Sequence, residues 1–165
     1  MSTLFHLATR FATSLSRRPP NASDEQWAQS WLQPPEIALW KRLPAPDRRH
    51  ALAVARATEL RLGSVTERPV MAAALLHDVG KLESGLGTLG RVAATIAGVV
   101  RGRHRLRPTG RFGRYVQHGD LGAALLTEAG SDALTVSWAR EHHRDAAHWT
   151  LPRAIADALK AGDDD

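Results

Sequence analysis

The sequence predicts an all-α fold, and three observations support this prediction. Apolar residues recur at steps of three and four along most of the chain, which is the spacing of one face of a helix. No segment alternates apolar and polar residues as a half-buried strand does. Prolines stand at or before the starts of the helical stretches, where the first turn tolerates them. We therefore expect a chain of helices joined by turns and loops.

The first half of the chain begins with an amphipathic segment and ends in a strongly apolar one. Residues 1–22 are expected to form an N-terminal helix and a linker, since helically spaced apolar residues are followed by Pro19 and Pro20. The most apolar helix is predicted at residues 70–77. Three helices are predicted between these two: a short one around Trp27 and Trp31, one over residues 36–42, and one from 44–47 to Leu62, which Gly63 stops.

The second half contains an arginine-rich segment between two groups of helices. Six arginines fall within residues 101–114, where glycine and proline disfavour regular structure, so we expect a loop. The domain itself is expected to cover residues 23–162, followed by a solvated, disordered acidic tail at 163–165. The predicted helices are an apolar one at 89–100, one at 118–129 that stops at Gly130, one that Ser131 caps and that runs to about His143, and a last one that Thr150 and Pro152 open and Gly162 ends.

The composition indicates one globular domain without disulfides. With 165 residues, of which 43% are hydrophobic and 24% charged, the chain can bury a core of its own. It contains no cysteine, which excludes a disulfide framework, a thiolate metal site and a cysteine nucleophile. The net charge of +5 favours anionic partners such as phosphates, nucleic acid or acidic lipid. No apolar run is long enough for a transmembrane segment, and we expect a cytoplasmic protein, with an oligomer left open.

The most specific local pattern is His77-Asp78-Val79-Gly80-Lys81, where the most apolar predicted helix must end. An imidazole and a carboxylate side by side can chelate one cation, and the second carboxylate oxygen can bridge to a neighbour. Gly80 lets the backbone turn, and Lys81 offers a mobile ammonium group suited to a phosphate oxygen. This pattern predicts a metal site with a phosphate-binding residue beside it.

Five of the eight histidines lie on or at the ends of predicted helices, so that they can converge. His142 continues an apolar stripe of its helix, which favours it as an inward-facing ligand. His143 would diverge from it by about 100° on a regular helix, so it is the second choice. The five residues are His50, His77, His118, His142 and His143.

This ordered set resembles the HD-domain superfamily of metal-dependent phosphohydrolases. The pattern of that family is a leading His, a His-Asp dyad, further His residues and a late Asp. The resemblance implies an all-α, HD-domain helical bundle with a metal site in its core. The matching elements are His50, His77-Asp78, His118-Gly119-Asp120, Glu141-His142-His143 and Ile155-Ala156-Asp157.

The resemblance also implies a set of metal ligands. His50, His77, Asp78 and Asp157 look like the ligands of a first metal, with Asp78 as the bridge to a second. His118 and His142 look like the ligands of that second metal, and related binuclear proteins can use both adjacent histidines. We therefore expect one or two divalent ions, and nitrogen and oxygen ligands suit Fe, Mn, Co, Ni, Zn or Mg.

The activity implied is hydrolysis of a phosphoester or phosphoanhydride, in a nucleotide or another small phosphorylated metabolite, by metal-activated water. Asp78 and Lys81 are the expected catalytic residues, and Lys81 with Arg103, Arg105 and Arg107 of the loop would bind substrate phosphates. Alternatively, the loop is simply solvated. Contact of the loop with nucleic acid or with an acidic membrane surface is possible from its charge but is not favoured. The Gly-Tyr-Pro element of the branch that cleaves cyclic diguanylate is missing after His142-His143, which disfavours that substrate.

Two other functions fit the same resemblance. A regulatory module could keep the HD fold and sense a nucleotide or a metal without turnover. A diiron oxygenase is the third alternative, because the inositol-cleaving oxygenases use a related set of residues.

Overall fold

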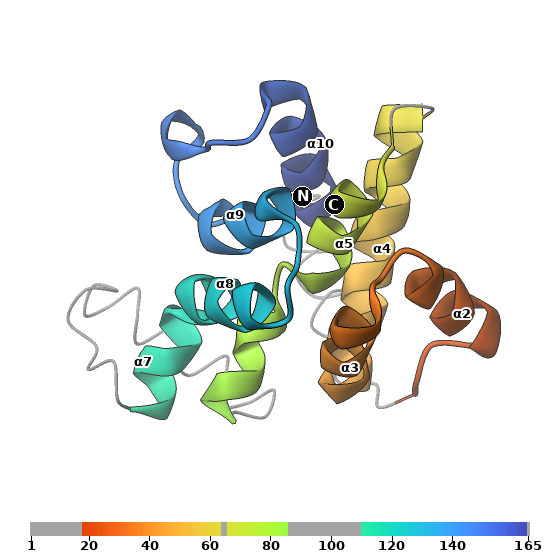
Figure 1. Ribbon diagram of the computed structural model, residues 1–165, viewed down its shortest axis with the longest axis horizontal. Coiled ribbons are helices and arrows are strands. Elements are labelled where there is room, and N and C mark those ends of the chain that lie inside the picture. Colours follow the sequence, from red (N-terminus) through yellow and green to blue (C-terminus); the bar gives the residue numbers. More distant parts are fainter. Residues whose placement is uncertain (1–17, 64–65, 86–109, 165) are drawn as a thin grey trace, which may run out of the picture.

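Every regular element that the structure describes is helical, which confirms the all-α prediction. The structure is a computed structural model, and it describes residues 18–63, 66–85 and 110–164 (Figure 1). None of the helices in these ranges is long and apolar enough to cross a membrane. The elements are α2 (Ala22–Ser30), α3 (Pro34–Arg42), α4 (Ala45–Leu62), α5 (Arg68–Leu76), the 3-10 helix η2 (Val79–Ser84), α7 (Arg111–Val116), α8 (His118–Glu128), α9 (Ala133–Glu141), the 3-10 helix η4 (Ala146–His148) and α10 (Arg153–Asp164).

Helix α5 is the centre of the fold because it is apolar on every side. All seven residues from Val70 to Leu76 are buried, as expected for a helix without a polar face. Helices α4 and α9 pack against it, α10 packs on α4, and α8 packs on α9 (Figure 1). The buried end of α5 therefore places His77 and Asp78 in the middle of the domain.

The helix ends agree with the sequence at some positions and differ at others. Gly63 and Gly130 have positive φ angles of 56° and 70°, the left-handed conformation in which a glycine ends a helix. Gly162 was also expected to end a helix, but its φ angle is not positive, and α10 continues through Asp164. Asp163 and Asp164 are therefore helical rather than part of a disordered tail, and residue 165 lies outside the described residues. Asp132, rather than Ser131, caps α9 by accepting a hydrogen bond from the Leu134 amide at 2.9 Å.

The described end of the predicted arginine loop is a helix. Residues 111–116 form α7, which packs on η2, and the Arg111 side chain donates hydrogen bonds to the carbonyl groups of Ser84 and Gly85. This anchoring on η2 explains why Arg111 and its neighbours adopt regular structure in spite of Gly113. The helix predicted at 89–100 and the candidate residues Arg103, Arg105 and Arg107 lie outside the described residues, as does most of the N-terminal segment.

Candidate metal centre

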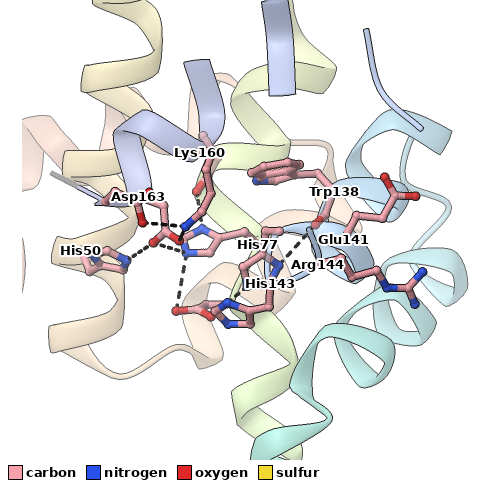
Figure 2. Close-up of polar contacts among 12 residues, drawn as sticks. His50, His77, Trp138, Glu141, His143, Arg144, Lys160 and Asp163 are labelled. Carbon is pink, nitrogen blue, oxygen red and sulfur yellow. Dashed lines mark hydrogen bonds and ion pairs between the residues drawn. The ribbon is translucent and has the colours of Figure 1, made fainter. Parts of the chain in front are cut away.

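The candidate metal centre is formed by side chains that lie mostly at helix ends around the buried end of α5 (Figure 2). Helix ends suit this role because several chain segments can meet there without their helices crossing. His77 and Asp78 follow α5, His118 begins α8, His142 and His143 follow α9, His50 lies in α4, and Asp163 lies in the last turn of α10.

The first group of ligand atoms comes from α4, the end of α5 and α10. His50, His77 and Asp78 each offer an atom, and these atoms lie within 4.8 Å of one another. Asp163 Oδ1 joins them at 3.1 Å from His50 Nε2 and 3.5 Å from His77 Nε2. Three of these four residues were expected as ligands of the first metal.

The second group shares Asp78 with the first. Asp78, His118, His142 and His143 offer atoms that lie within 4.8 Å of one another. Asp78 Oδ1 is 3.1 Å from His118 Nε2 and 3.7 Å from His142 Nε2, and His143 Nε2 is 3.0 Å from His118 Nε2. The carboxylate of Asp78 thus stands between two sets of imidazoles, where a bridging ligand would stand.

Three of the imidazoles are held in the same tautomer by the backbone. The Nδ1 atoms of His77, His118 and His142 lie 2.9, 2.6 and 2.9 Å from the carbonyl oxygen three residues earlier in the chain. A carbonyl oxygen only accepts, so each Nδ1 must carry the proton. In the neutral ring the lone pair is then on Nε2, the atom that faces the cluster, and such second contacts are usual for histidines that bind metals.

Several of the converging atoms are buried without a hydrogen-bond partner. His77 Nε2, His142 Nε2 and Asp78 Oδ1 have no hydrogen-bond partner. Water does not replace a partner there, because His77 is only 1% exposed and His142 is fully buried. Lone pairs and a carboxylate oxygen gathered in a small buried space repel one another, and leaving them unpaired is costly. A bound cation removes both problems, so the residues present fit a divalent metal.

The two carboxylates are ionised at neutral pH. Burial alone would raise the pKa of Asp78, but the charges of Lys81 and His77 hold it well below its usual range. Burial would also raise the pKa of Asp163, and its interactions with His50 and His77 outweigh that effect and lower it. The site therefore presents two negative charges to a cation.

His142 and His143 of the second group have lowered pKa values, so they are neutral at neutral pH, which is the form that binds metals. Burial lowers the pKa of His142, and desolvation with the nearby imidazoles of His142 and His118 lowers that of His143 to about 2. His77 differs from them. Burial would lower its pKa, but the charges of Asp78 and Asp163 raise it above 6.5, so a proton competes with a cation there.

Three glycines bring the ligand-bearing segments close together, and each stands within two residues of a ligand. A methyl group on Gly80 would overlap the carbonyl oxygen of His118, so the turn after the dyad lies directly on the start of α8. A methyl group on Gly119 would lie 3.1 Å from a backbone carbonyl oxygen of α9, and one on Gly162 would lie 2.9 Å from that of Val54. At Gly80 and Gly162 any larger residue would force a backbone to shift, and at Gly119 the contact would be tight.

His143 takes part in the cluster together with His142, although helical geometry made it the second choice. The reason is that α9 ends at Glu141, so His142 and His143 lie in a turn and need not diverge as they would on a helix. Their ring centroids are 4.0 Å apart. The buried Glu141 stabilises this turn, because its carboxylate accepts hydrogen bonds from the amide and hydroxyl groups of Thr150 at 2.7 and 2.8 Å.

The structure does not bring Asp157 to the cluster, and Asp163 occupies the expected place of the late carboxylate. Asp157 is exposed and forms an ion pair with Arg153 at 2.8 Å on the outer face of α10. Asp163 lies four residues after the fully buried Leu159, on the helix face that packs inward. That spacing was the sequence signal for Asp163, and the mistaken end of the helix at Gly162 concealed it.

Two further candidates occupy different environments. The Lys81 ammonium donates to Asp78 Oδ2, and its side chain is 18% exposed, so it stands between the cluster and solvent. Asp120, which belongs to the matching element that begins at His118, has an exposed side chain that lies 3.7 and 3.6 Å from the guanidinium groups of Arg140 and Arg144. Asp120 is an acidic residue of a first helical turn, away from the cluster.

Comparison with known proteins identifies the family. The model of the HD domain family matches residues 48–162, which include all of the clustered ligands except Asp163, and the chain therefore belongs to this family. Neither the curated proteins nor the solved structures include a chain that matches this one. Proteins with an HD domain are mostly metal-dependent phosphohydrolases.

Proposed function

We propose that the chain is a metal-dependent phosphohydrolase that cleaves a phosphoester or phosphoanhydride of a nucleotide or another small phosphorylated metabolite. The observation that carries this proposal is the position of Asp78. One carboxylate belongs to two groups of ligand atoms, each group lying within 4.8 Å, and the Lys81 ammonium donates to its Oδ2 atom. A bridged pair of cations beside a lysine is an arrangement suited to a phosphoryl group.

The ligand sets divide between two ions. His50, His77, Asp78 and Asp163 would hold the first, and Asp78 with the three residues of the second group would hold the other. Divalent ions bound there supply Lewis acidity toward a phosphoryl oxygen and lower the pKa of water. A set of nitrogen and oxygen ligands without sulfur suits Fe, Mn, Co, Ni, Zn or Mg.

The protein groups around this centre support the same chemistry. Lys81 is close enough to Asp78 to contact an oxyanion next to it, and it would offset charge on the nonbridging oxygens. His77, His142 and Asp78 are buried, whereas the side chains of His50 and Lys81 are 30% and 18% exposed. His143 is exposed as well, so a substrate would reach the centre from the side on which His50, Lys81 and His143 meet solvent. A cytoplasmic location stays a prediction.

Metal analysis and a substrate panel test the proposal together. Protein purified anaerobically is analysed for its metal content and then assayed with phosphomonoesters, phosphodiesters and nucleotides. We expect bound divalent metal and turnover of at least one class, and Asp78→Ala should lose both because it removes the shared ligand. Metal binding without turnover of any phosphorylated compound would instead favour a sensing module. Turnover that does not depend on phosphate would favour an oxygenase.

A further inference from the structure

Lys160 is a second lysine at the candidate metal centre, one turn before Asp163 on α10 (Figure 2). Its Nζ atom lies 3.7 Å from Asp163 Oδ2 and 2.5 Å from Asp164 Oδ1. The Lys160 side chain is 30% exposed, whereas that of Asp163 is 13% exposed. The ammonium group therefore stands on the solvent side of a carboxylate whose other oxygen faces the cluster.

Lys160 and Lys81 have the same relationship to their carboxylates. Each lysine is three residues from its aspartate and approaches the Oδ2 atom. The Oδ1 atoms face imidazoles: that of Asp163 faces His50 and His77, and that of Asp78 faces His118 and His142. Asp78 Oδ2, which Lys81 contacts, also lies 3.5 Å from His77 Nε2. Both carboxylates are thus shared between inner imidazoles and an outer ammonium group, and the two lysines come from different helices.

This arrangement changes when a carboxylate binds a cation. The cation then neutralises the negative charge of the carboxylate from the inner side. The ammonium group on the outer side is attracted less by the carboxylate and is repelled by the cation. The contact of Lys160 with Asp164 does not prevent its release, because an exposed pair at i,i+4 is weak. Lys160 is long, flexible and partly exposed, so it can turn towards a negatively charged group at the opening.

We propose that Lys160 is an oxyanion-binding residue that exchanges Asp163 for an anionic oxygen of the substrate when the first metal group is filled. The proposal rests on the proposed function, since the oxyanion is taken to be a phosphate group. Lys81 and Lys160 then approach this phosphate from η2 and α10. The competing interpretation is that Lys160 only neutralises Asp163 and Asp164 on the helix surface.

Binding of Mn²⁺ and of inorganic phosphate separates the two interpretations without an activity assay. Mn²⁺ is titrated into metal-free protein by calorimetry, and orthophosphate is then titrated into the Mn²⁺-loaded protein at constant ionic strength. Lys160→Met should bind Mn²⁺ at least as tightly as the unaltered protein, because a competing cation has been removed. It should bind phosphate about tenfold more weakly, the loss expected for one hydrogen bond to a charged group.

Two further variants complete the experiment. Lys160→Arg keeps a cation at this place and should retain most of the phosphate affinity, which also guards against a fold defect in Lys160→Met. Lys41→Met removes the same charge from an exposed position of α3 and should leave both affinities unchanged. Equal phosphate affinity in Lys160→Met and Lys41→Met would overturn the role of Lys160 while leaving the proposed function intact. Bound Mn²⁺ without any phosphate binding by the unaltered protein would overturn both.

Discussion

Gly162 in α10 lies directly against the backbone of Val54 in α4, since a methyl group on Gly162 would be 2.9 Å from the Val54 carbonyl oxygen. The same group would be 3.0 Å from Thr58 Oγ1, which donates a hydrogen bond to that carbonyl oxygen. The next residue is Asp163, whose carboxylate faces His50 of α4 at 3.1 Å. The close approach of the two helices therefore determines where this carboxylate stands.

Gly162→Ala should disturb both the fold and the first ligand group. The added methyl group has to displace a helix backbone, and overpacking of this kind costs about 1–3 kcal/mol of unfolding free energy. The shift of α10 should also weaken metal binding at Asp163. Urea unfolding and a metal titration measure the two effects, with Ala154→Ser on the exposed face of α10 as the control. Unchanged metal affinity in Gly162→Ala would show that the helix contact does not position Asp163.

Asp163, rather than Asp157, should be needed for metal binding. Asp163→Asn removes an ionised oxygen that faces His50 and His77, and it should weaken the affinity for the first ion by more than about tenfold, since even residues that only support ligands contribute that much. Asp157→Asn breaks only an exposed pair with Arg153 and should bind metal normally. Competition with a chromophoric chelator measures both affinities. The reverse result would restore Asp157 as the ligand.

Much of the site was predictable because its members follow strong local signals. His77 and Asp78 stand at the end of a helix that is apolar on every side, and such a helix has to be buried. His142 continues the apolar stripe of the helix before it, and the order of the elements resembles that of the HD family. These signals are local in the sequence, so they can be recognised without knowledge of how the helices pack.

The errors arose where packing decides the local structure. Gly162 is read from sequence as a helix end, yet here it serves a close contact with α4, and the helix continues to Asp163. His143 joins the cluster because α9 ends one residue before His142, a boundary that local spacing does not fix. The residues that begin α7 were predicted to lie in a loop, but α7 packs on the short helix η2. This contact joins segments that are distant in the sequence, so local patterns do not reveal it.

The second ligand group should determine how many metal ions bind. His118→Ala and His142→Ala each remove an imidazole from the group that shares Asp78, so stoichiometry should fall from about two to about one per chain. Turnover should fall strongly, with a smaller effect on substrate affinity. Elemental analysis after anaerobic reconstitution measures the stoichiometry, and the exposed His148→Ala is the control. Saturation of the unaltered protein at one ion would contradict the binuclear assignment.

The arginine-rich segment should act on substrate binding rather than on chemistry. Changing Arg103, Arg105 and Arg107 to Gln removes three cations, and it should raise KM with little change in kcat, the signature of lost uniform binding. Steady-state kinetics with phosphorylated substrates measure this effect. A control that changes three basic residues elsewhere to Gln (Lys41, Arg42 and Arg61) preserves the net charge of the triple variant. Kinetics equal to those of the control would leave the segment as a solvated loop.

His77, His142 and His143 together should stabilise the metal-free protein most strongly near pH 6.5. The pKa of His77 is raised above 6.5 because Asp78 and Asp163 outweigh its burial. Its stabilising contribution is therefore complete below pH 6.5 and is lost as the pH rises through the folded pKa. Each tenfold gain in the proton affinity of His77 on folding corresponds to about 1.4 kcal/mol of this contribution.

The second group acts on the other side of this maximum. The pKa values of His142 and His143 are lowered, so the folded protein takes up fewer protons than the unfolded chain and loses stability as the pH falls below 6.5. The free energy of unfolding is measured by urea titration in the presence of a chelator at a series of pH values chosen between pH 5 and pH 9. This series follows the loss of stability on the acidic side and on the alkaline side. His77→Asn should remove the loss on the alkaline side and keep the loss on the acidic side. A loss on the alkaline side that is the same in this variant would mean that His77 does not carry the raised pKa.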